Sequence, residues 1–290
     1  MKTSNKLLIS LGILFFVLPL IGMIIFSSIY YKTRDTSSNY ERELMDVTNQ
    51  SFGTPSPDRT TIVINTPYHA VNIVNGNGSS IELRLIRDES SGIKIANDVV
   101  EHLDFKVENG ILNISFKKGF SIEDFRDRIV IFAYSPGFDD LSVKNASNFN
   151  LIAVADSLNI NLKSCKSFSV SNSAMETHIQ TYNGDTTNHM KFNETIIKML
   201  NVDLDDSKFL LSDMNMETLN IKAENHSFLE LDCISQNKEK PIVKNLRIKT
   251  LGVNNVKINN FNTEKITADF SDETTLDIPG SILKGIVNNN

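Results

Sequence analysis

The sequence predicts an all-β protein whose body is a parallel β-helix (solenoid), with a hairpin-rich N-terminal cap and one transmembrane helix before it. Three observations predict this fold. Pairs of short strands recur with a period of roughly 20 residues, each strand alternates apolar and polar residues, and a long uncharged apolar stretch lies near the N-terminus. A repeat of this length is typical of a solenoid, in which each repeat contributes one layer of strands.

The repeat is clearest in six units between Leu141 and Ile278, each with an opening strand, a polar turn and a closing strand. The opening strands begin at Leu141, Leu158, Leu200, Leu219, Leu246 and Ile266, so they are 17, 42, 19, 27 and 20 residues apart. We interpret the spacing of 42 as two coils, one of them degraded around Met175–Gln180. Three closing strands carry a phenylalanine at an equivalent position (Phe168, Phe209 and Phe228), which predicts an aromatic ladder in the core.

The alternation of residue types explains why the coils are expected to stack. Leu, Ile, Val and Phe fall on one face of each strand, and Asn, Lys, Asp and Ser fall on the other. A single coil cannot bury its apolar face, whereas coils stacked about 4.8 Å apart close a continuous core and pair every strand. An antiparallel sandwich is the alternative that the pattern leaves open.

Residues 1–34 are expected to form a short cytoplasmic head and a membrane anchor. The stretch from Leu7 to Tyr31 is uncharged, and 25 helical residues at about 1.5 Å each exceed the roughly 30 Å thickness of a hydrocarbon core. The alternative is a cleaved signal peptide, whose apolar region is only about 7–15 residues long. We therefore expect a single-pass membrane protein with a cytoplasmic N-terminus and an extracytoplasmic body, either periplasmic or on the cell surface.

Residues 35–58 are polar, end with Pro55 and Pro57, and are expected to be a linker. Residues 59–140 are expected to form the cap, and 59–290 to be one continuous domain with the solenoid repeats at 141–290. The strongest hairpin signal in the cap is Val107-Glu108-Asn109-Gly110-Ile111, where Asn-Gly separates two alternating apolar runs. A cap is expected because the terminal units of a solenoid must cover the open end of the core.

The charge distribution excludes some classes of partner. The whole chain has a formal charge of −6, and residues 1–34 carry four bases and no acids, so the remaining chain carries −10. An acidic exterior repels phosphate groups, which makes nucleic acid and anionic lipid headgroups poor partners.

The order of strands in the cap resembles a known family. The segments beginning Thr61-Ile-Val-Ile, Ala70-Val-Asn-Ile-Val and Ile81-Glu-Leu-Arg-Leu, followed by Phe105 to Phe116 and by Ile129 to Ser147, are similar to the head of DUF2807 proteins. These proteins are also called putative auto-transporter adhesins with a head GIN domain and are common in Bacteroidetes. The resemblance covers roughly Thr60 to Ile278 and implies an extracytoplasmic, right-handed β-helix with no established enzymatic activity.

Residues that could carry chemistry are sparse. Asp203, Asp205 and Asp206 form the densest group of acids in the repeats and are weak candidates for a calcium site, without the loop glycine and terminal Glu of an EF-hand. The five histidines are scattered, and no motif of a hydrolase, a nucleotide-binding protein or a zinc protease is present. Cys165 and Cys233 are expected to lie three coils apart, too far for a disulfide. We predict no catalytic residue, no cofactor-binding residue and no cofactor.

The sequence therefore favours a membrane-anchored, non-enzymatic adhesion or interaction module. Its outward Asn and Ser residues suit hydrogen bonding to an envelope protein or a glycan. Two alternatives remain: an envelope polysaccharide-processing β-helix enzyme, and a tethered scaffold that assembles end to end. Neither the ligand nor the oligomeric state follows from the sequence.

Overall fold

The computed structural model describes residues 17–21, 23, 51–56, 58–117, 128–171, 177–179, 188–190, 195–233 and 242–289. The chain divides into two compact units, Met1–Val47 and Thr48–Asn290. In the first unit, residues 17–21 and 23 are helical and exposed. No helix within the described ranges has the length and hydropathy to cross a membrane. The rest of the expected span at 7–31, and residues 35–50 of the expected linker, lie outside those ranges.

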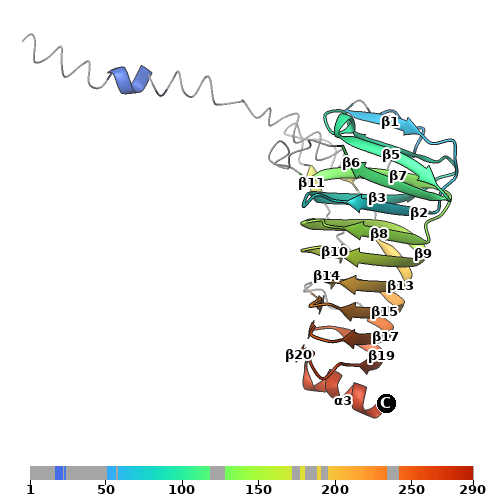
Figure 1. The fold of residues 1–290 in the computed structure, drawn as a ribbon, viewed down its shortest axis with the longest axis vertical. Helices are drawn as coiled ribbons and strands as arrows, with labels where there is room; N and C mark the ends of the chain where they lie inside the picture. Colours follow the sequence, from blue (N-terminus) through green and yellow to red (C-terminus); the bar gives the residue numbers. More distant parts are fainter. Residues whose placement is uncertain are drawn as a thin grey trace, which may run out of the picture. The chain divides into compact units, whose positions relative to one another are not determined.

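The second unit confirms the predicted all-β class (Figure 1). Its first strands are β1 (Arg59–Val63), β2 (Ala70–Asn75), β3 (Ser80–Arg87), β4 (Gly92–Ala96), β5 (Leu103–Glu108), β6 (Ile111–Phe116), β7 (Ile129–Ser135), β8 (Asp140–Lys144), β9 (Asn148–Lys163) and β10 (Phe168–Ser171), with a 3-10 turn at Val100–His102. The later elements are β11 (Thr177–Ile179), β12 (Asn188–Met190), β13 (Ile196–Asp205), β14 (Lys208–Ser212), β15 (Met216–Glu224), β16 (Phe228–Asp232), β17 (Ile242–Leu251), β18 (Asn255–Asn259), β19 (Asn262–Asp269), β20 (Thr275–Asp277) and the helix α3 (Gly280–Asn289).

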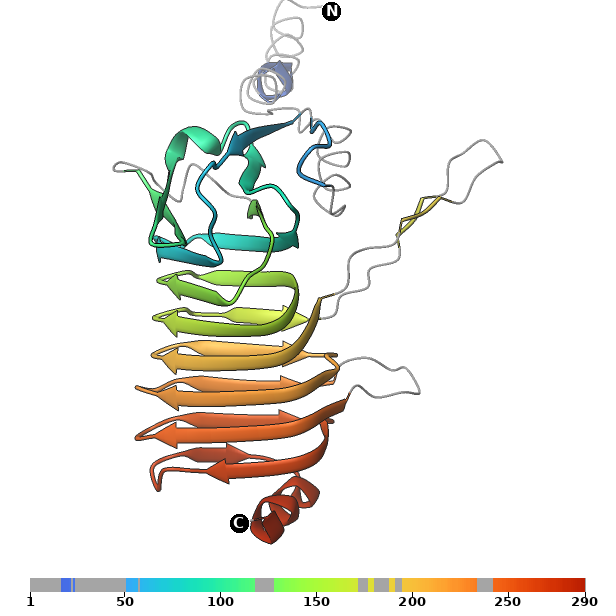
Figure 2. The same cartoon turned by 90° about the vertical axis from the view of Figure 1, so that its right-hand side faces the viewer.

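Two ladders of parallel strands make up most of this unit. The first ladder runs β7, β3, β9, β10, β14, β16, β18, β20, and the second runs β6, β2, β8, β9, β13, β15, β17, β19. The chain alternates between the ladders, so consecutive strands such as β13 and β14 lie at the same level of the stack (Figure 2). Strand β9 belongs to both, because Phe149–Ala153 pair in the first ladder and Val154–Lys163 pair in the second. An antiparallel sandwich is therefore wrong for these strands.

The register of the second ladder matches the predicted opening strands. Leu158, Leu200, Leu219, Leu246 and Ile266 pair in sequence across β9, β13, β15, β17 and β19, and all five are buried. Side chains two residues apart lie on the same face of a strand, so the apolar residue two positions further along each strand falls in a second buried column. Stacking thus converts the alternation seen in the sequence into a continuous core.

The prediction of a degraded coil around Met175–Gln180 is wrong. Strand β10 pairs directly with β14, and β9 pairs directly with β13, so the spacing of 42 residues is one coil with an insertion. Within the insertion, β11 and β12 form a separate antiparallel pair that lies away from the stack (Figure 2). The direct pairing satisfies the backbone groups of β9 and β13, which leaves no place for an extra strand between them.

The aromatic ladder exists but has different members. Phe149, Phe168 and Phe209 are aligned in the first ladder, and their rings are stacked in the core. The prediction that Phe228 belongs to the ladder is wrong. Phe228 pairs with Lys208, and Leu229 is the residue that follows Phe209 in the buried column. A shift of one residue turns a side chain to the opposite face of a strand, and Leu229 and Leu231 occupy the inner face of β16.

The N-terminal end is covered by antiparallel strands. The predicted hairpin is confirmed, because β5 pairs antiparallel with β6 through Asn109 and Gly110, whose φ angles are 53° and 76°. Strands β1 and β4 extend the first ladder antiparallel from β7. Within residues 59–140, however, β2 and β3 already pair in parallel with β8 and β9. Parallel stacking therefore begins at Ala70.

The C-terminal end is covered by α3. The helix packs on β19, where Ile286 is only 6% exposed and Ile282 contacts the core. Gly285 allows this close approach, since a Cβ at its position would lie 3.1 Å from Ile266 Cγ2. Leu283, which lies next to Ile282 in the helix, is 47% exposed.

The corners between the ladders are held by side chains that accept hydrogen bonds from the backbone of the preceding coil. The Cys165 amide donates to Ser207 Oγ, the Ser207 amide donates to Ser227 Oγ, and the Ser227 amide donates to Asn254 Oδ1. Cys165 and Cys233 both carry buried thiols, as expected. They are two coils apart rather than three, because the insertion does not add a coil.

Candidate functional site: a polar face on the second ladder

The outward side chains of the second ladder form two columns that run across the strands. We call Asp140, Asn159, Asn201, Asn220, Arg247 and Thr267 the amide column, and Asn161, Asp203, Lys222, Lys249 and Asp269 the charged column. Members of a column are direct partners on adjacent strands, and the columns are two residues apart along each strand. Together they form what we call the polar face.

Side-chain hydrogen bonds link the first four members of the amide column, from Asp140 to Asn220. Asn159 Nδ2 donates to Asp140 Oδ1 at 2.9 Å, Asn201 Nδ2 donates to Asn159 Oδ1 at 2.8 Å, and Asn220 Nδ2 donates to Asn201 Oδ1 at 2.7 Å. All three bonds therefore run in the same direction. An ionised carboxylate only accepts hydrogen bonds, so Asp140 fixes this direction for the whole series.

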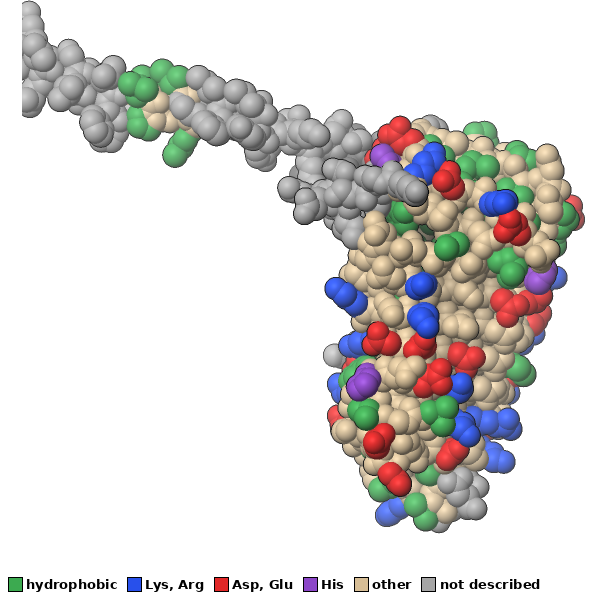
Figure 3. Space-filling view, viewed as in Figure 1, with side chains coloured by type: hydrophobic (Ala, Val, Ile, Leu, Met, Phe, Trp, Pro, Cys, Tyr) green, Lys and Arg blue, Asp and Glu red, His purple; other side chains and the backbone are tan. Residues whose placement is uncertain are grey.

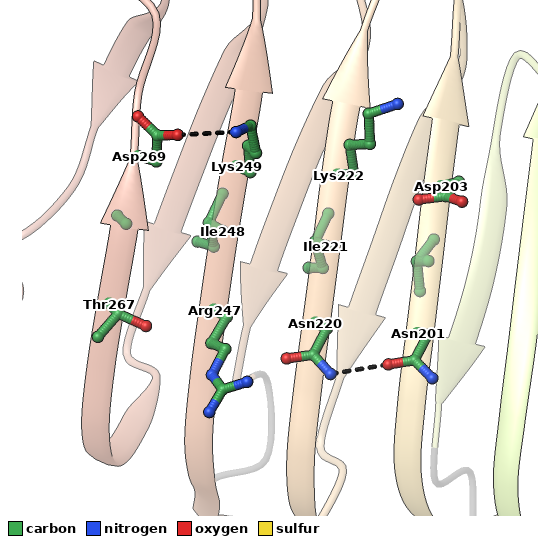
Figure 4. Close-up of a pocket in the computed structure, with 12 residues that line it drawn as sticks. Asn201, Asp203, Asn220, Ile221, Lys222, Arg247, Ile248, Lys249, Thr267 and Asp269 are labelled. Atoms are coloured by element: carbon green, nitrogen blue, oxygen red, sulfur yellow. Dashed lines mark hydrogen bonds and ion pairs between the residues drawn. The ribbon is translucent and has the colours of Figure 1, made fainter.

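The series ends at the boundary between β15 and β17. Asn220 Oδ1 is buried and has no hydrogen-bond partner, although Arg247 is the next member of the column. In Figure 4 this oxygen points towards the strand of Arg247, whose side chain extends along the face without reaching it. A buried carbonyl oxygen without a donor costs free energy, so this position favours a molecule that supplies one.

The basic groups of the charged column are paired with carboxylates. Lys222 Nζ lies 3.2 Å from Glu224 Oε2, and Lys249 Nζ lies 3.1 Å from Asp269 Oδ2. Next to this column, Lys163 Nζ lies 2.7 Å from Asp205 Oδ2. On the side of the molecule in Figure 3, acidic and basic side chains are likewise interspersed along the stack. Exposed pairs of this kind contribute little stability, but they neutralise the lysines.

Two shallow grooves hollow the polar face. The lower groove, of about 490 Å³, crosses β13, β15, β17 and β19 and is lined by both columns from Asn201 and Asp203 to Thr267 and Asp269 (Figure 4). The upper groove, of about 520 Å³, continues the same face past Asn159 and Asp140 to His69. Both are lined by amides, hydroxyls and charged groups between the edges of apolar side chains.

The three calcium candidates are separated by the strand geometry. Asp203 lies in the charged column between Asn161 and Lys222, whereas Asp206 lies at the corner with a φ of 48°. Hydrogen bonds from Lys163 and Asn225 lower the pKa of Asp205 and occupy its carboxylate. Across the described residues, no group of three or more acids, histidines and cysteines has the arrangement of a metal site.

Two features of the structure were missed by sequence reasoning. The amide column has a sequence signal, since Asn follows Leu at the start of three opening strands (Asn159, Asn201 and Asn220). The pairing of His178 with His189 across β11 and β12 has no such signal, because it depends on the register of a hairpin inside the insertion.

One family model matches most of the chain. The model of the family described as "DUF2807: Putative auto-transporter adhesin, head GIN domain" matches residues 73–278. No curated protein matches the chain.

Several solved structures are similar over most of their length. A putative lipid binding protein from Parabacteroides distasonis is 10% identical, with a TM-score of 0.41 over 77% of this chain and 94% of that chain. A putative adhesin from Parabacteroides merdae is 13% identical, with a TM-score of 0.35 over 76% and 94%. A putative adhesin from Bacteroides fragilis is 13% identical, with a TM-score of 0.32 over 77% and 99%.

Proposed function

Because the chain belongs to the DUF2807 family of putative auto-transporter adhesins with a head GIN domain, we propose that it is a non-enzymatic adhesion module held outside the cytoplasm by a membrane anchor. The module binds an envelope protein or glycan through the polar face. The single observation that carries this proposal is the alignment of hydrogen-bonding side chains across successive strands of the second ladder.

The architecture supports such a role in the following way. Two parallel strands per coil, joined by short corners, suit a right-handed β-helix, because crossover connections between parallel strands are overwhelmingly right-handed. A β-helix presents fixed side chains at regular intervals, so recognition is distributed over many weak contacts instead of one deep pocket. The polar face has this form, with grooves that are long and shallow.

Anchoring is proposed from the residues of the N-terminal stretch. Leu7 to Tyr31 is long enough to cross a bilayer, and residues 35–50 provide a polar spacer. The spacer ends where the chain is fixed to the cap, since Lys94 Nζ donates to the carbonyl oxygens of Ser51 and Thr54 at 2.9 and 2.7 Å.

Protease treatment of intact cells, combined with sequencing of the mature N-terminus, tests the anchor and the location. We expect digestion of the body on intact cells or spheroplasts and a mature chain that retains residues 7–31. A mature chain that begins after Tyr31, or a body protected in spheroplasts, would contradict the proposal.

The polar face is tested by a bulky substitution in its middle. Asn161 is exposed, lines the upper groove and pairs with Asp203, which lines both grooves, so Asn161→Arg places a long side chain where the two grooves adjoin. We expect the full-length variant to lose binding to whichever glycan or envelope protein a glycan array and pull-down identify for the wild type. Asn255→Arg, at an exposed position on β18 of the first ladder, is the matched control and keeps binding. Equal binding by all three proteins would place the interaction elsewhere.

An enzyme that processes polysaccharides is the second candidate, and one geometric feature favours it. Asp203 and Asp205 are two residues apart on the same side of β13, a spacing compatible with a pair of glycosidase carboxylates. Such a pair needs a general acid, whose pKa is raised. The pKa of Asp205 is instead lowered by Lys163, which supports the binding module over the enzyme.

End-to-end assembly is the third candidate. It needs an open ladder end, whereas α3 packs on β19 at the C-terminal end and antiparallel strands cover the other. This arrangement supports a module that does not polymerise through its coils.

A further inference from the structure

We propose that the lower groove binds an acidic saccharide unit, with Arg247 holding its carboxylate and Asn220 Oδ1 accepting a hydrogen bond from a neighbouring hydroxyl. This inference rests on the proposed binding function and specifies its ligand. It follows from two unmet requirements on adjacent strands, one for a negative charge and one for a hydrogen-bond donor.

The requirement for negative charge comes from Arg247. Within the described part of the chain, the lower groove contains three basic side chains, Lys222, Arg247 and Lys249. Both lysines have carboxylate partners, while no ion pair or hydrogen bond is found for the exposed guanidinium of Arg247 in that part. A guanidinium presents two parallel N–H groups that match a carboxylate. Arg247 is therefore the basic group that remains available to an anion.

The requirement for a donor comes from the direction of the amide series. Asp140 accepts from Asn159, so each amide in turn directs its NH₂ group towards the preceding strand of the ladder and its oxygen towards the following strand. Turning the Asn220 amide over would place its oxygen against Asn201 Oδ1, where two acceptors would repel. The last group of the series must then be an acceptor, and Asn220 Oδ1 is buried without a donor.

One ligand class meets both requirements. A sugar acid carries a carboxylate and hydroxyl groups on the same ring, and these can reach adjacent strands, which are about 4.8 Å apart. Thr267, on the other side of Arg247, adds a hydroxyl that can donate or accept (Figure 4). The net charge of −10 outside the anchor opposes long polyanions, so a short acidic segment of a glycan fits better than a densely charged polymer.

An acidic peptide fits this groove less well. Peptides gain most of their affinity by extending a sheet edge or by filling apolar pockets. The lower groove lies on the outward faces of β13, β15, β17 and β19, and its outward side chains are amides, hydroxyls and charges. Backbone hydrogen bonding to a peptide is therefore not available there, because β13, β15 and β17 are paired on both sides and α3 packs on β19, the last strand of the ladder.

Calorimetric titration of the full-length chain at low salt tests the inference with three probes: a galacturonic acid tetrasaccharide, the galactose tetrasaccharide with the same linkages, and tetraglutamate. We expect the acidic saccharide to bind at least about tenfold more tightly than either of the others. Arg247→Gln should lower its affinity at least about tenfold, since a charge-assisted bidentate pair is lost. Lys244→Gln removes a charge from an exposed position on the same strand outside the groove and should leave the affinity within about twofold.

Equal affinity of the wild type and a folded Arg247→Gln variant would overturn the inference, as would tighter binding of tetraglutamate or failure of the acidic saccharide to bind. The proposed function has a separate readout. If Asn161→Arg abolishes binding to the identified partner while the acidic saccharide does not bind the wild type, the polar face stands and the ligand class is wrong. Circular dichroism of each variant establishes that it is folded.

Discussion

Phe149 and Phe168 stack in the core of the first ladder with their ring centroids 4.9 Å apart and their planes 6° from parallel. Phe209 continues the stack at 6.0 Å from Phe168, so three successive coils contribute one ring each. Phe168 and Phe209 are fully buried. The stack fixes the register of the coils beneath the polar face, because a one-residue slip would move these rings to the outside.

The first prediction compares two phenylalanines. Phe168→Ala should lower the free energy of unfolding by about 3–5 kcal/mol, as for other buried phenylalanines. Phe228→Ala should cost much less, because Phe228 is only partly buried and its ring lies under Lys208 Nζ at 4.8 Å. Urea denaturation of the two variants measures the difference. Equal destabilisation would contradict the assigned register.

The register also shows how far the sequence predicts this fold. The alternation of Leu, Ile and Val located the opening strands, because burial of one face requires a period of two. The same pattern placed Phe228 wrongly, because both Phe228 and Leu229 are apolar and only packing decides which one faces the core. The insertion after β10 was misread for a similar reason: a strand-like pattern does not reveal whether the strand joins the stack or forms its own hairpin.

The second prediction concerns the direction of the amide series. Asn201→Asp places a carboxylate oxygen against Asn159 Oδ1, where an NH₂ group donates in the wild type. We expect a loss of about 1–3 kcal/mol at pH 7. The introduced carboxyl is easier to protonate in the folded state, because only its protonated form can donate to Asn159. The loss should therefore shrink as the pH falls towards about 3.9, the pKa of an unperturbed Asp.

The measurement is thermal unfolding of the wild type and the variant at several pH values. Asn255→Asp, on an exposed position of β18, is the control and should show no comparable recovery in acid. A loss that does not depend on pH would mean that the amide series does not have the direction assigned to it.

The third prediction concerns the cover at the C-terminal end. Ile286→Asp places a charge where α3 packs on β19, so the helix should detach and expose the end of the second ladder. Exposed strand edges promote association, and we expect oligomers in size-exclusion chromatography with light scattering. Val287→Asp, one residue later but 69% exposed, should behave as the wild type. If the two variants behave alike, α3 does not protect this end.

The fourth prediction concerns acid stability. A hydrogen bond from Lys257 at 2.9 Å, helped by Lys208 at 3.5 Å, lowers the pKa of Glu230 below its usual value. A carboxyl whose pKa is lowered by folding stabilises the protein above its unfolded pKa, and this contribution is lost as the pH falls through the folded value. Glu230→Gln should therefore be less stable than the wild type at pH 7, and the difference should shrink as the pH falls below about 4.3, the pKa of an unperturbed Glu. The exposed Glu264→Gln variant is the control.

The candidate site was less predictable than the fold. The outward Asn residues were visible in the sequence, but the unmet acceptor on Asn220 depends on Asp140, 80 residues earlier in the chain. The availability of Arg247 likewise depends on which carboxylates reach Lys222 and Lys249. Such properties arise from the register between coils, which composition and spacing do not determine.

The last prediction separates a binding module from an enzyme or a calcium-binding protein. Asp203, Asp205 and Asp206 are changed together to Asn, which keeps size and polarity and removes three charges. We expect the variant to remain folded, because Asp203 and Asp206 are exposed and the Lys163–Asp205 pair lies at the surface. Its affinity for the partner identified for the wild type should stay within a few fold, since recognition extends over both columns. Loss of activity on a polysaccharide, or a calcium-dependent rise in melting temperature seen only in the wild type, would refute the module. Calcium would then bind through these carboxylates, and the carboxylate of Asp205 would have to leave Lys163 to take part.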